Sequence, residues 1–440
     1  MEIETLIHAR WVLPISEGSS VLEHSCVAVD KGKIITLCSS QEANDQFKAI
    51  NNISLSDHVL MPGLINAHSH TPMTLFRGLA DDIPLMSWLN DHIWPAEGKW
   101  VKKEFVADGT KLAIAEMIKS GTTSFNDMYF FPETISKVAI EAGIRCNIGL
   151  ILIDFPTVYA QDSADYFEKA LEVHDQIRHE KLINSCFAPH APYSVSDETL
   201  KKMLSVVNEL ELPIHMHVHE TKEEIQESMK KYGMRPIKRL QKLGLMNSSM
   251  IAVHMTQITE NEIQILAKNK VNVVHCPESN LKLASGFCPV QRLAEFGVNI
   301  GIGTDGAASN NDLDMFGEMR TAALLGKGVA ENASALPAKK VLEMATINGA
   351  KALGQDHKIG SLEKGKEADI IALDLGSFAT KPLYNLESQI VYAVGKDQVS
   401  DVWVAGRQIM KQKVILSLDA KKIMEKTAFW QKCISDEDKI

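Results

Sequence analysis

The stretch Val59-Leu60-Met61-Pro62-Gly63-Leu64-Ile65-Asn66-Ala67-His68-Ser69-His70 is an apolar run that ends in two histidines separated by one residue. Residues i and i+2 of a β-strand point to the same face, so the two imidazoles can bind one metal ion. The run therefore indicates a buried strand that ends in half of a metal site. A histidine pair at a strand end is also often structural, so the interpretation depends on the rest of the chain.

Downstream of this run, apolar segments alternate with helical patterns. We expect strands near residues 61–68, 121–126, 144–151, 183–189, 212–218, 250–254, 271–275 and 298–304. Helical patterns such as 104–119 and 198–210 lie between them. This alternation is typical of βα units and a parallel sheet. Eight such strands in roughly 300 residues predict a (β/α)8 barrel, in which catalytic groups lie at the C-terminal ends of the strands.

The two ends of the chain contain shorter strand-like pieces. They lie at 6–12, 25–30, 33–37, 368–374 and 399–407. We expect residues 1–60 and 360–440 to form one small β-sandwich domain, with a helix in the C-terminal tail. Residues 61–359 would form the barrel domain. The predicted fold class is therefore α/β, a TIM-like barrel with a small β-sandwich built from both chain termini.

The expected barrel strands end repeatedly in histidine or an acidic residue. These strand-end residues are His68, His70, His190, His217, His219, Glu220, His254, His275 and Asp305. A lone buried histidine is more often a structural core residue. Packing alone does not favour such endings on six strands, so their coincidence predicts one shared metal site.

The fifth strand carries three alternating histidines, which share one face by the period of two. They are His215, His217 and His219. Three histidines of one strand cannot all bind one ion. Glu220, just past the strand, places a carboxylate above an ion held by His217, so we expect His217 as the ligand and keep His219 as the alternative. His215 would lie one layer deeper, in a hydrogen-bonded structural role.

Three imidazoles and one carboxylate leave an open position for water on a divalent ion such as Zn²⁺. Such an ion lowers the pKa of the water toward about 7, so hydroxide forms at neutral pH. Glu220 and Asp305 would flank the hydroxide and are suited to proton transfer. His254 would orient the hydroxide or stabilise charge at the attacked carbon.

The composition argues against several classes of partner. The chain has 440 residues and a formal net charge of −10. Nucleic acids and anionic membranes are bound by clustered Lys and Arg, so neither is expected as a partner. The sequence shows no signal-peptide pattern and no run of roughly 18 apolar residues. Its seven cysteines are scattered and form no C-x-x-C pair, which favours a reduced, cytoplasmic chain.

These motifs carry a resemblance to the amidohydrolase superfamily. It rests on the stretch from Pro62 to His70, on His217 and His254, and on Thr304-Asp305-Gly306. More narrowly, the chain resembles the methylthioadenosine/S-adenosylhomocysteine deaminases, and the related triazine hydrolases share much of the pattern. The narrower motifs are Trp88-Leu89, Ile93-Trp94-Pro95-Ala96-Glu97, His190-Ala191-Pro192-Tyr193-Ser194, Ser279-Asn280-Leu281-Lys282-Leu283 and 303–310. The resemblance covers about residues 55–375.

The resemblance implies a mononuclear metal site and assigns roles around it. The implied ligands are His68, His70, His217 and Asp305, and the implied proton-transfer residues are Glu220 and His254. Glu97 would bind ribose hydroxyls and His190 would contact the substrate. Trp88 or Trp94 could cover a base, although ordinary loop packing explains them equally well. Binuclear relatives have a carboxylated lysine at the end of strand four. The sequence 185–190 has none, which favours one ion per chain, with Zn²⁺ expected first and Fe²⁺ or Mn²⁺ as alternatives.

The expected reaction is hydrolytic deamination of an adenosine-type nucleoside at C6, and 5′-methylthioadenosine is the first substrate. Relatives that accept S-adenosylhomocysteine typically have an arginine soon after strand three. Here the stretch 147–156 has no arginine and carries Asp154, so this second substrate is less favoured. Leu150, Ile151 or Leu152 could line a pocket for an apolar methylthio group. A homo-oligomer is compatible with the sequence.

Two alternatives remain open. One is a deaminase or chlorohydrolase of another N-heterocycle, such as guanine, a pterin or an s-triazine. Glu97 argues against it, because those substrates lack a ribose diol. The other is a non-catalytic scaffold with the same fold, which would lack some of the ligands. A cytidine-deaminase type of site is excluded, because the sequence has neither an H-x-E nor a P-C-x-x-C motif.

Overall fold

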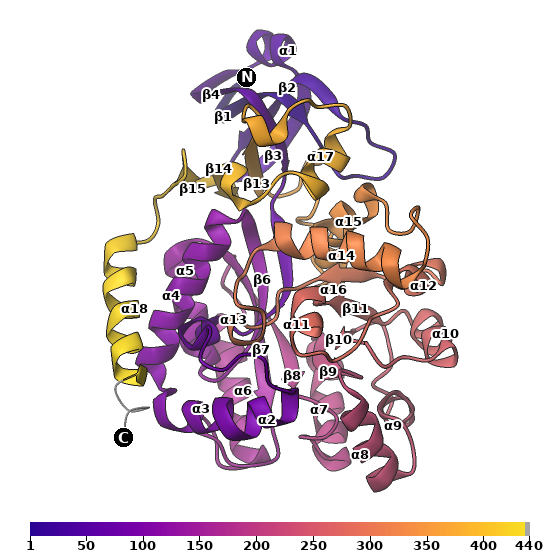
Figure 1. Ribbon diagram of the computed structural model, residues 1–440. Helices are drawn as coiled ribbons and strands as arrows, with labels where there is room; N and C mark the ends of the chain where they lie inside the picture. The colour runs from indigo at the N-terminus through magenta and orange to yellow at the C-terminus, as the bar shows by residue number, and fades with distance from the viewer. Residues whose placement is uncertain (436–440) are drawn as a thin grey trace.

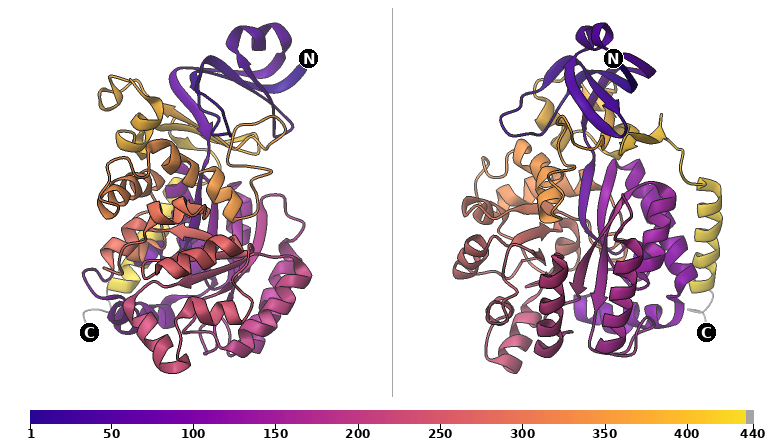
Figure 2. Two further views of the ribbon diagram at one scale, coloured as in Figure 1. Left: turned by 90° about the vertical axis from the view of Figure 1, so that its right-hand side faces the viewer. Right: turned by 180° about the vertical axis from the view of Figure 1, so that it is seen from behind.

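The chain folds into two eight-stranded sheets, one above the other in Figure 1. The computed structural model describes residues 1–435, so the last five residues of the predicted segment 360–440 lie outside the described residues. The lower sheet is the barrel, and the upper sheet combines strands from both ends of the chain (Figure 2).

The barrel sheet runs in chain order and its strands are parallel. Its strands are β5 (Leu64–Ser69), β6 (Thr122–Met128), β7 (Arg145–Leu152), β8 (Ile183–Pro189), β9 (Ile214–Val218), β10 (Met250–His254), β11 (Asn272–His275) and β12 (Ile300–Ile302). The first and last strands meet where Ser69 pairs with Asp305 in a parallel bridge. This contact closes the barrel next to His68 and confirms the predicted barrel fold.

Helices cover the outside of the barrel and form its connections. They are η1 (Thr71–Phe76), α2 (Leu85–Ser87), η2 (Trp88–Ile93), α3 (Trp94–Trp100), α4 (Lys103–Lys119), α5 (Pro132–Ala142), α6 (Ser163–Ile177), α7 (Asp197–Leu210), α8 (Lys222–Tyr232), α9 (Pro236–Lys242), α10 (Glu260–Asn269), α11 (Pro277–Lys282), α12 (Val290–Glu295), α13 (Ala307–Asn310), α14 (Met315–Val329), α15 (Ala338–Met344) and α16 (Ile347–Ala352). In the described part of the chain, no helix has the length and apolarity needed to cross a membrane.

The upper sheet is mixed. Strand β1 runs parallel to β4, and all other neighbouring strands of this sheet are antiparallel. Its strands are β1 (Glu2–Val12), β2 (Leu22–Asp30), β3 (Lys33–Ser39), β4 (Lys48–Pro62), β13 (Ile370–Asp374), β14 (Val399–Val404), β15 (Arg407–Lys411) and β16 (Val414–Ile415). Its neighbouring short helices are α1 (Ser40–Gln46), η3 (Phe378–Thr380), α17 (Leu386–Tyr392) and η4 (Lys396–Gln398). The last helix, α18 (Ala420–Ser435), lies beside α4 on the outside of the barrel (Figure 1). The terminal segments therefore build one small β-unit together.

The apolar run at residues 59–69 forms two strands rather than the single strand expected near 61–68. Residues up to Pro62 end β4 in the upper sheet, and Leu64 begins β5 in the barrel. The break falls at Gly63, where an added Cβ would lie 2.0 Å from the Thr123 Oγ1. Glycine is needed for this close approach, which leads the chain directly from one sheet into the other.

A buried ion pair also links the two sheets. Arg145, the first residue of β7, donates through Nε to Asp369 Oδ2 at 2.6 Å and through Nη2 to Glu367 at 2.8 Å. Arg145 is buried, so this charge is compensated where the sheets meet. The barrel and the upper sheet are thus held together by both covalent continuity and paired charge.

Candidate metal centre and active site

Four side chains from three strand ends meet at the C-terminal mouth of the barrel. One nitrogen each of His68, His70 and His217 and one oxygen of Asp305 all lie within 4.8 Å of one another. His68 Nε2 and His70 Nε2 are 3.3 Å and 3.2 Å from Asp305 Oδ1. His68 Nε2 is also 3.2 Å from His217 Nε2. These are the four ligands expected from the resemblance.

The other ring nitrogen of each histidine has its own partner. Nδ1 of His70 contacts the Met128 carbonyl, and Nδ1 of His217 contacts the His190 carbonyl at 2.7 Å. A carbonyl only accepts, so each Nδ1 carries the proton and each neutral ring turns a lone pair on Nε2 toward the shared point. Lone pairs that converge with a carboxylate need a cation between them. The donor set therefore fits a divalent metal ion.

Asp305 is held in place by hydrogen bonds to both of its carboxylate oxygens. Ser279 Oγ and Ser309 Oγ donate to Oδ2 at 2.6 Å and 3.1 Å, and the Gly306 N–H donates to Oδ1 at 2.7 Å. Although burial acts in the opposite direction, the His68 and His70 imidazoles hold the pKa of Asp305 well below its usual value. Asp305 is therefore an anionic group with a fixed orientation, as a metal ligand would need to be.

The expectation that three histidines share one face of the fifth strand is wrong at His219. Strand β9 ends at Val218, and His219 has a left-handed backbone with φ of 56°. Its ring turns away from the ligand group. Nδ1 donates to the Gln257 carbonyl at 3.2 Å and Nε2 accepts the Ile237 N–H at 3.2 Å. His217 belongs to the ligand group and His219 does not.

His215 lies one layer deeper, as the sequence indicated. Its Nε2 is 3.0 Å from His68 Nδ1, whereas its own Nδ1 is buried without a hydrogen-bond partner among the described residues. His68 must donate through Nδ1 to leave Nε2 free, so His215 accepts and carries its proton on the unpartnered nitrogen. His215 thus does for His68 what backbone carbonyls do for the other two imidazoles.

We expect His215→Phe to weaken metal binding by about 10- to 100-fold, because His68 loses the acceptor that fixes its ring. Competition with a chelator measures this affinity directly. His275→Phe is the matched control. His275 is also a buried histidine of a barrel strand with an unpartnered Nδ1 among the described residues, but it lies outside the ligand group. Equal losses in both variants would show a general packing effect instead.

Glu220 and His254 face each other beside the ligand group. Glu220 Oε2 is 3.9 Å from His254 Nε2, and the His254 ring stacks on the His217 ring with centroids 5.4 Å apart. His254 Nδ1 contacts Asn280 Oδ1 at 2.9 Å, which orients the ring toward the cavity. Burial raises the pKa of Glu220 above its usual value. A carboxyl group of raised pKa next to a metal site is suited to proton transfer at neutral pH.

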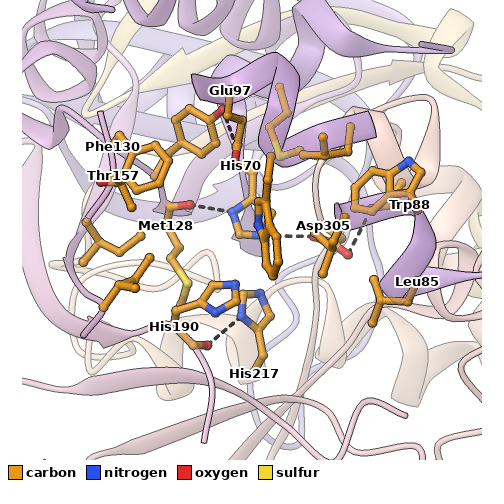
Figure 3. A pocket seen from close by; sticks show the side chains of 18 of the residues that line it. His70, Leu85, Trp88, Glu97, Met128, Phe130, Thr157, His190, His217 and Asp305 are labelled. Carbon is orange, nitrogen blue, oxygen red and sulfur yellow. Dashed lines mark hydrogen bonds and ion pairs between the residues drawn. The ribbon is translucent and has the colours of Figure 1, made fainter. Parts of the chain in front are cut away.

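A cavity of about 280 Å³ opens in front of these groups and is lined mainly by apolar side chains (Figure 3). Its size lies near the lower end of the range for small-molecule sites. Glu97, Trp88 and His190 all line it, as expected from the resemblance. The His190 ring lies 5.0 Å from the His217 ring, and its Nδ1 contacts Ser194 Oγ at 3.0 Å.

Glu97 is a buried carboxyl group with one hydrogen-bond partner for its side chain within residues 1–435. The Tyr129 hydroxyl donates to its Oε1 at 2.7 Å. Burial raises the pKa of Glu97 to about 7. Trp88 is also buried, and its indole N–H donates to the Ala80 carbonyl at 3.0 Å. Trp88 can therefore offer only apolar contact to a bound molecule, whereas Glu97 Oε2 remains available to accept hydrogen bonds.

Several residues of the site had no predicted role. Asp127 accepts the Thr71 N–H at 2.7 Å and the Ser69 hydroxyl at 3.2 Å, and so holds the segment after His70. Tyr129 orients Glu97. Both lie just beyond 126, where the second strand was expected to end. The observed strand continues to Met128. A predicted strand two residues longer would have placed Asp127 and Tyr129 at its C-terminal end, at the mouth of the barrel.

Comparison with known proteins agrees with this geometry. Residues 59–409 match the model of the amidohydrolase family. The 5-methylthioadenosine/S-adenosylhomocysteine deaminase of Saccharophagus degradans is 50% identical over 428 residues, 97% of this chain and 96% of that protein. The protein of the same name from Teredinibacter turnerae is 45% identical over 98% of this chain and 97% of its own length.

Solved structures give the same result. A zinc-bound adenosine deaminase from Xanthomonas campestris superposes with a TM-score of 0.98 at 48% identity and covers 99% of both chains. The zinc complex of the atrazine chlorohydrolase TrzN from Arthrobacter aurescens superposes with a TM-score of 0.91 over 97% of this chain, but its 21% identity shows only the shared fold. The chain therefore belongs to the amidohydrolase family, in the group of the 5-methylthioadenosine/S-adenosylhomocysteine deaminases.

Proposed function

We propose that this protein is a zinc-dependent deaminase that converts 5′-methylthioadenosine and water to 5′-methylthioinosine and ammonia. One observation carries the proposal. Three of the four proposed metal ligands (His70, His217 and Asp305), the Glu220–His254 pair and the buried carboxyl group of Glu97 all line one cavity, with His68 directly behind. The first set suits hydrolysis and the last suits a ribose diol, so together they favour a nucleoside substrate.

The proposed metal is one Zn²⁺ ion per chain, held by His68, His70, His217 and Asp305. A set of four nitrogen and oxygen donors is typical of a zinc site, and the similar Xanthomonas structure contains zinc. Fe²⁺ and Mn²⁺ bind similar donors and are the alternatives. When bound, the ion would supply activated water for attack at C6.

The surrounding residues would handle the protons of the reaction. Attack of water at C6 requires a proton at N1 of the purine, and departure of the amino group as ammonia requires another. Glu220 would accept a proton from the water and deliver it to the substrate, because burial raises its pKa above the usual value and so makes it a stronger base than an exposed carboxylate. His254, oriented by Asn280, would stabilise the charge that develops at C6. Asp305 would assist Glu220 in deprotonating the water.

Glu97 and Trp88 would select the nucleoside. Tyr129 uses Oε1 of Glu97, which leaves Oε2 for the ribose hydroxyls. Trp88 would pack against an apolar face of the substrate, and His190 would contact it from the opposite wall. Guanine, pterins and s-triazines have no diol for Glu97, which favours the nucleoside over these substrates. A non-catalytic scaffold is also disfavoured, because all four metal-ligand residues are present.

The test is release of ammonia from a panel of adenosine analogues, guanine and a triazine, with metal analysis of the same sample. We expect deamination of adenosine analogues by protein that contains about one zinc per chain. Turnover of guanine or the triazine in preference to every nucleoside would contradict the substrate assignment. A fully metal-free protein with undiminished activity would contradict the metal assignment.

Among the adenosine analogues, we expect 5′-methylthioadenosine to have a kcat/KM at least about tenfold above that of S-adenosylhomocysteine, the scale of one missing ion pair. Within residues 1–435, no Lys or Arg lines the cavity, so the homocysteine carboxylate has no cationic partner there. Ile151 and Ile153 line the cavity and can contact a methylthio group. Leu150 and Leu152 point to the other face of β7 and do not line it.

Side-by-side kinetics with the two substrates give the measurement. Asp154 contributes nothing to this preference, because its carboxylate accepts the Ser196 N–H at 2.7 Å outside the cavity lining. Asp154→Asn should therefore leave the ratio unchanged. Equal turnover of S-adenosylhomocysteine would show that a cation reaches the site from elsewhere, such as a second copy of the chain.

The cellular location and the assembly of the protein stay predictions. All seven cysteines are free thiols within the described residues 1–435, which supports the expected reduced, cytoplasmic environment. A homo-oligomer remains compatible with the sequence. Sedimentation of the zinc-loaded protein tests that expectation.

A further inference from the structure

A second buried acid lies directly behind the proposed proton-transfer residue. Glu224, in the first turn of α8, is 5% exposed and does not line the main cavity. Its Oε1 accepts the His219 N–H at 3.0 Å and its Oε2 accepts the Glu220 N–H at 2.7 Å. Both oxygens of one carboxyl group are thus bound to consecutive backbone amides.

These two amides belong to the turn that aims Glu220 at the metal site. Strand β9 ends at Val218, and His219 adopts the left-handed backbone that β-carbons disfavour. Because of this turn, the His219 ring leaves the ligand group and the Glu220 side chain enters the cavity. A disfavoured conformation persists only where neighbouring groups hold it, and Glu224 supplies two such contacts.

The peptide groups of Glu220 are held on both sides. Glu224 binds the N–H of Glu220, and the Thr256 hydroxyl donates to the carbonyl of Glu220 at 2.5 Å. The main chain of Glu220 is fixed at both ends, and its carboxyl group lies 3.9 Å from His254 Nε2. Among the described residues 1–435, no hydrogen bond holds this carboxyl group itself. The backbone contacts therefore fix the point and direction from which this side chain enters the cavity.

We propose that Glu224 is a positioning residue, which fixes Glu220 opposite His254 through the backbone amides of residues 219 and 220. The proposal rests on the proposed proton-transfer role of Glu220 and extends it to a residue that touches neither substrate nor metal. Glu224 acts on the rate of the reaction through Glu220 alone. Metal binding and substrate binding depend on other residues.

The variant Glu224→Gln keeps the shape but offers one acceptor oxygen where two N–H groups point. We expect kcat to fall on the order of 10- to 100-fold, as for small displacements of a reacting group, with KM and metal content close to those of the parent protein. Glu223→Gln is the matched control. Glu223 is the exposed neighbour in the same turn of α8 and should tolerate the change with parent kinetics.

A double-mutant cycle distinguishes positioning from general stabilisation. If Glu224 acts through Glu220, then Glu224→Gln in the Glu220→Gln background should lower kcat less than about twofold further. A loss in that background as large as in the parent would overturn the proposal, and so would a single variant with parent kcat. If Glu224→Gln fails to fold, Glu224→Asp supports the same cycle, because it keeps both oxygens but withdraws them by one methylene.

One measurement does not depend on the substrate. A crystal structure of Glu224→Gln should show the Glu220 carboxyl group displaced from its place opposite His254, while the four metal ligands stay where they are. An unmoved Glu220 would contradict the positioning role even if the activity fell. An inactive parent protein would instead contradict the proposed function, so the two failures can be told apart.

Discussion

Replacing His217 with alanine is expected to remove both the bound metal and the activity. His217 supplies one of four converging donors, and its Nε2 lies 3.2 Å from that of His68. Without it, the ion loses one of its four protein donors, and the remaining two imidazoles and one carboxylate should hold it too weakly to keep it through dialysis. Metal analysis after dialysis, followed by the ammonia assay on the same sample, measures both losses.

His219→Ala is the control for this prediction and should largely retain the metal. His219 lies two residues away and is equally a buried histidine, but its ring bonds to Gln257 and Ile237 instead of facing the ligands. Removing those bonds should cost stability, visible as a lower melting temperature, without emptying the site. If His219→Ala lost the metal and His217→Ala kept it, the ligand of the fifth strand would be His219.

Replacing Glu220 with glutamine is expected to reduce turnover by about 10²- to 10⁴-fold in metal-replete protein, the usual contribution of a positioned proton-transfer group. Glutamine has nearly the same shape but cannot take up or release the proton. The Glu220 side chain lies beside His254 and outside the four-residue ligand group, so the metal content of the variant should not change. Steady-state kinetics at matched zinc content provide the measurement. Turnover near that of the parent would exclude Glu220 from proton transfer.

Much of the barrel could be predicted because its strands are both apolar and bounded by clear helical patterns. Strands at 183–189 and 250–254 match β8 and β10 at both ends. The run at 59–69 was harder, because β4 and β5 are buried on either side of Gly63. Periodicity reports burial, but it does not report which sheet buries a segment.

The candidate site residues could be predicted where they lie at strand ends. They could not be predicted where their position depends on the backbone conformation or on backbone carbonyls. His68, His70, His217 and Asp305 all lie at or just past the C-terminal ends of apolar strands, so a pattern search finds them. The period of two fails at His219, because the strand has already ended and the backbone is left-handed there. The carbonyls of Met128 and His190 orient two ligands, but any residue type has a carbonyl, so no sequence signal marks them.

The bridge between Ser69 and Asp305 has a consequence for how variants of this protein should be interpreted. Asp305 is a candidate metal ligand and also the residue at which the last strand joins the first. A cation bound by both Asp305 and His68 would link the first and last strands of the barrel and so stabilise its closure. Metal occupancy and resistance to unfolding should then rise together, by mass action. A loss of activity in an Asp305 variant would combine a chemical effect with a loss of barrel closure. Glu220 lies away from this strand contact, so a Glu220 variant reports on the chemistry alone.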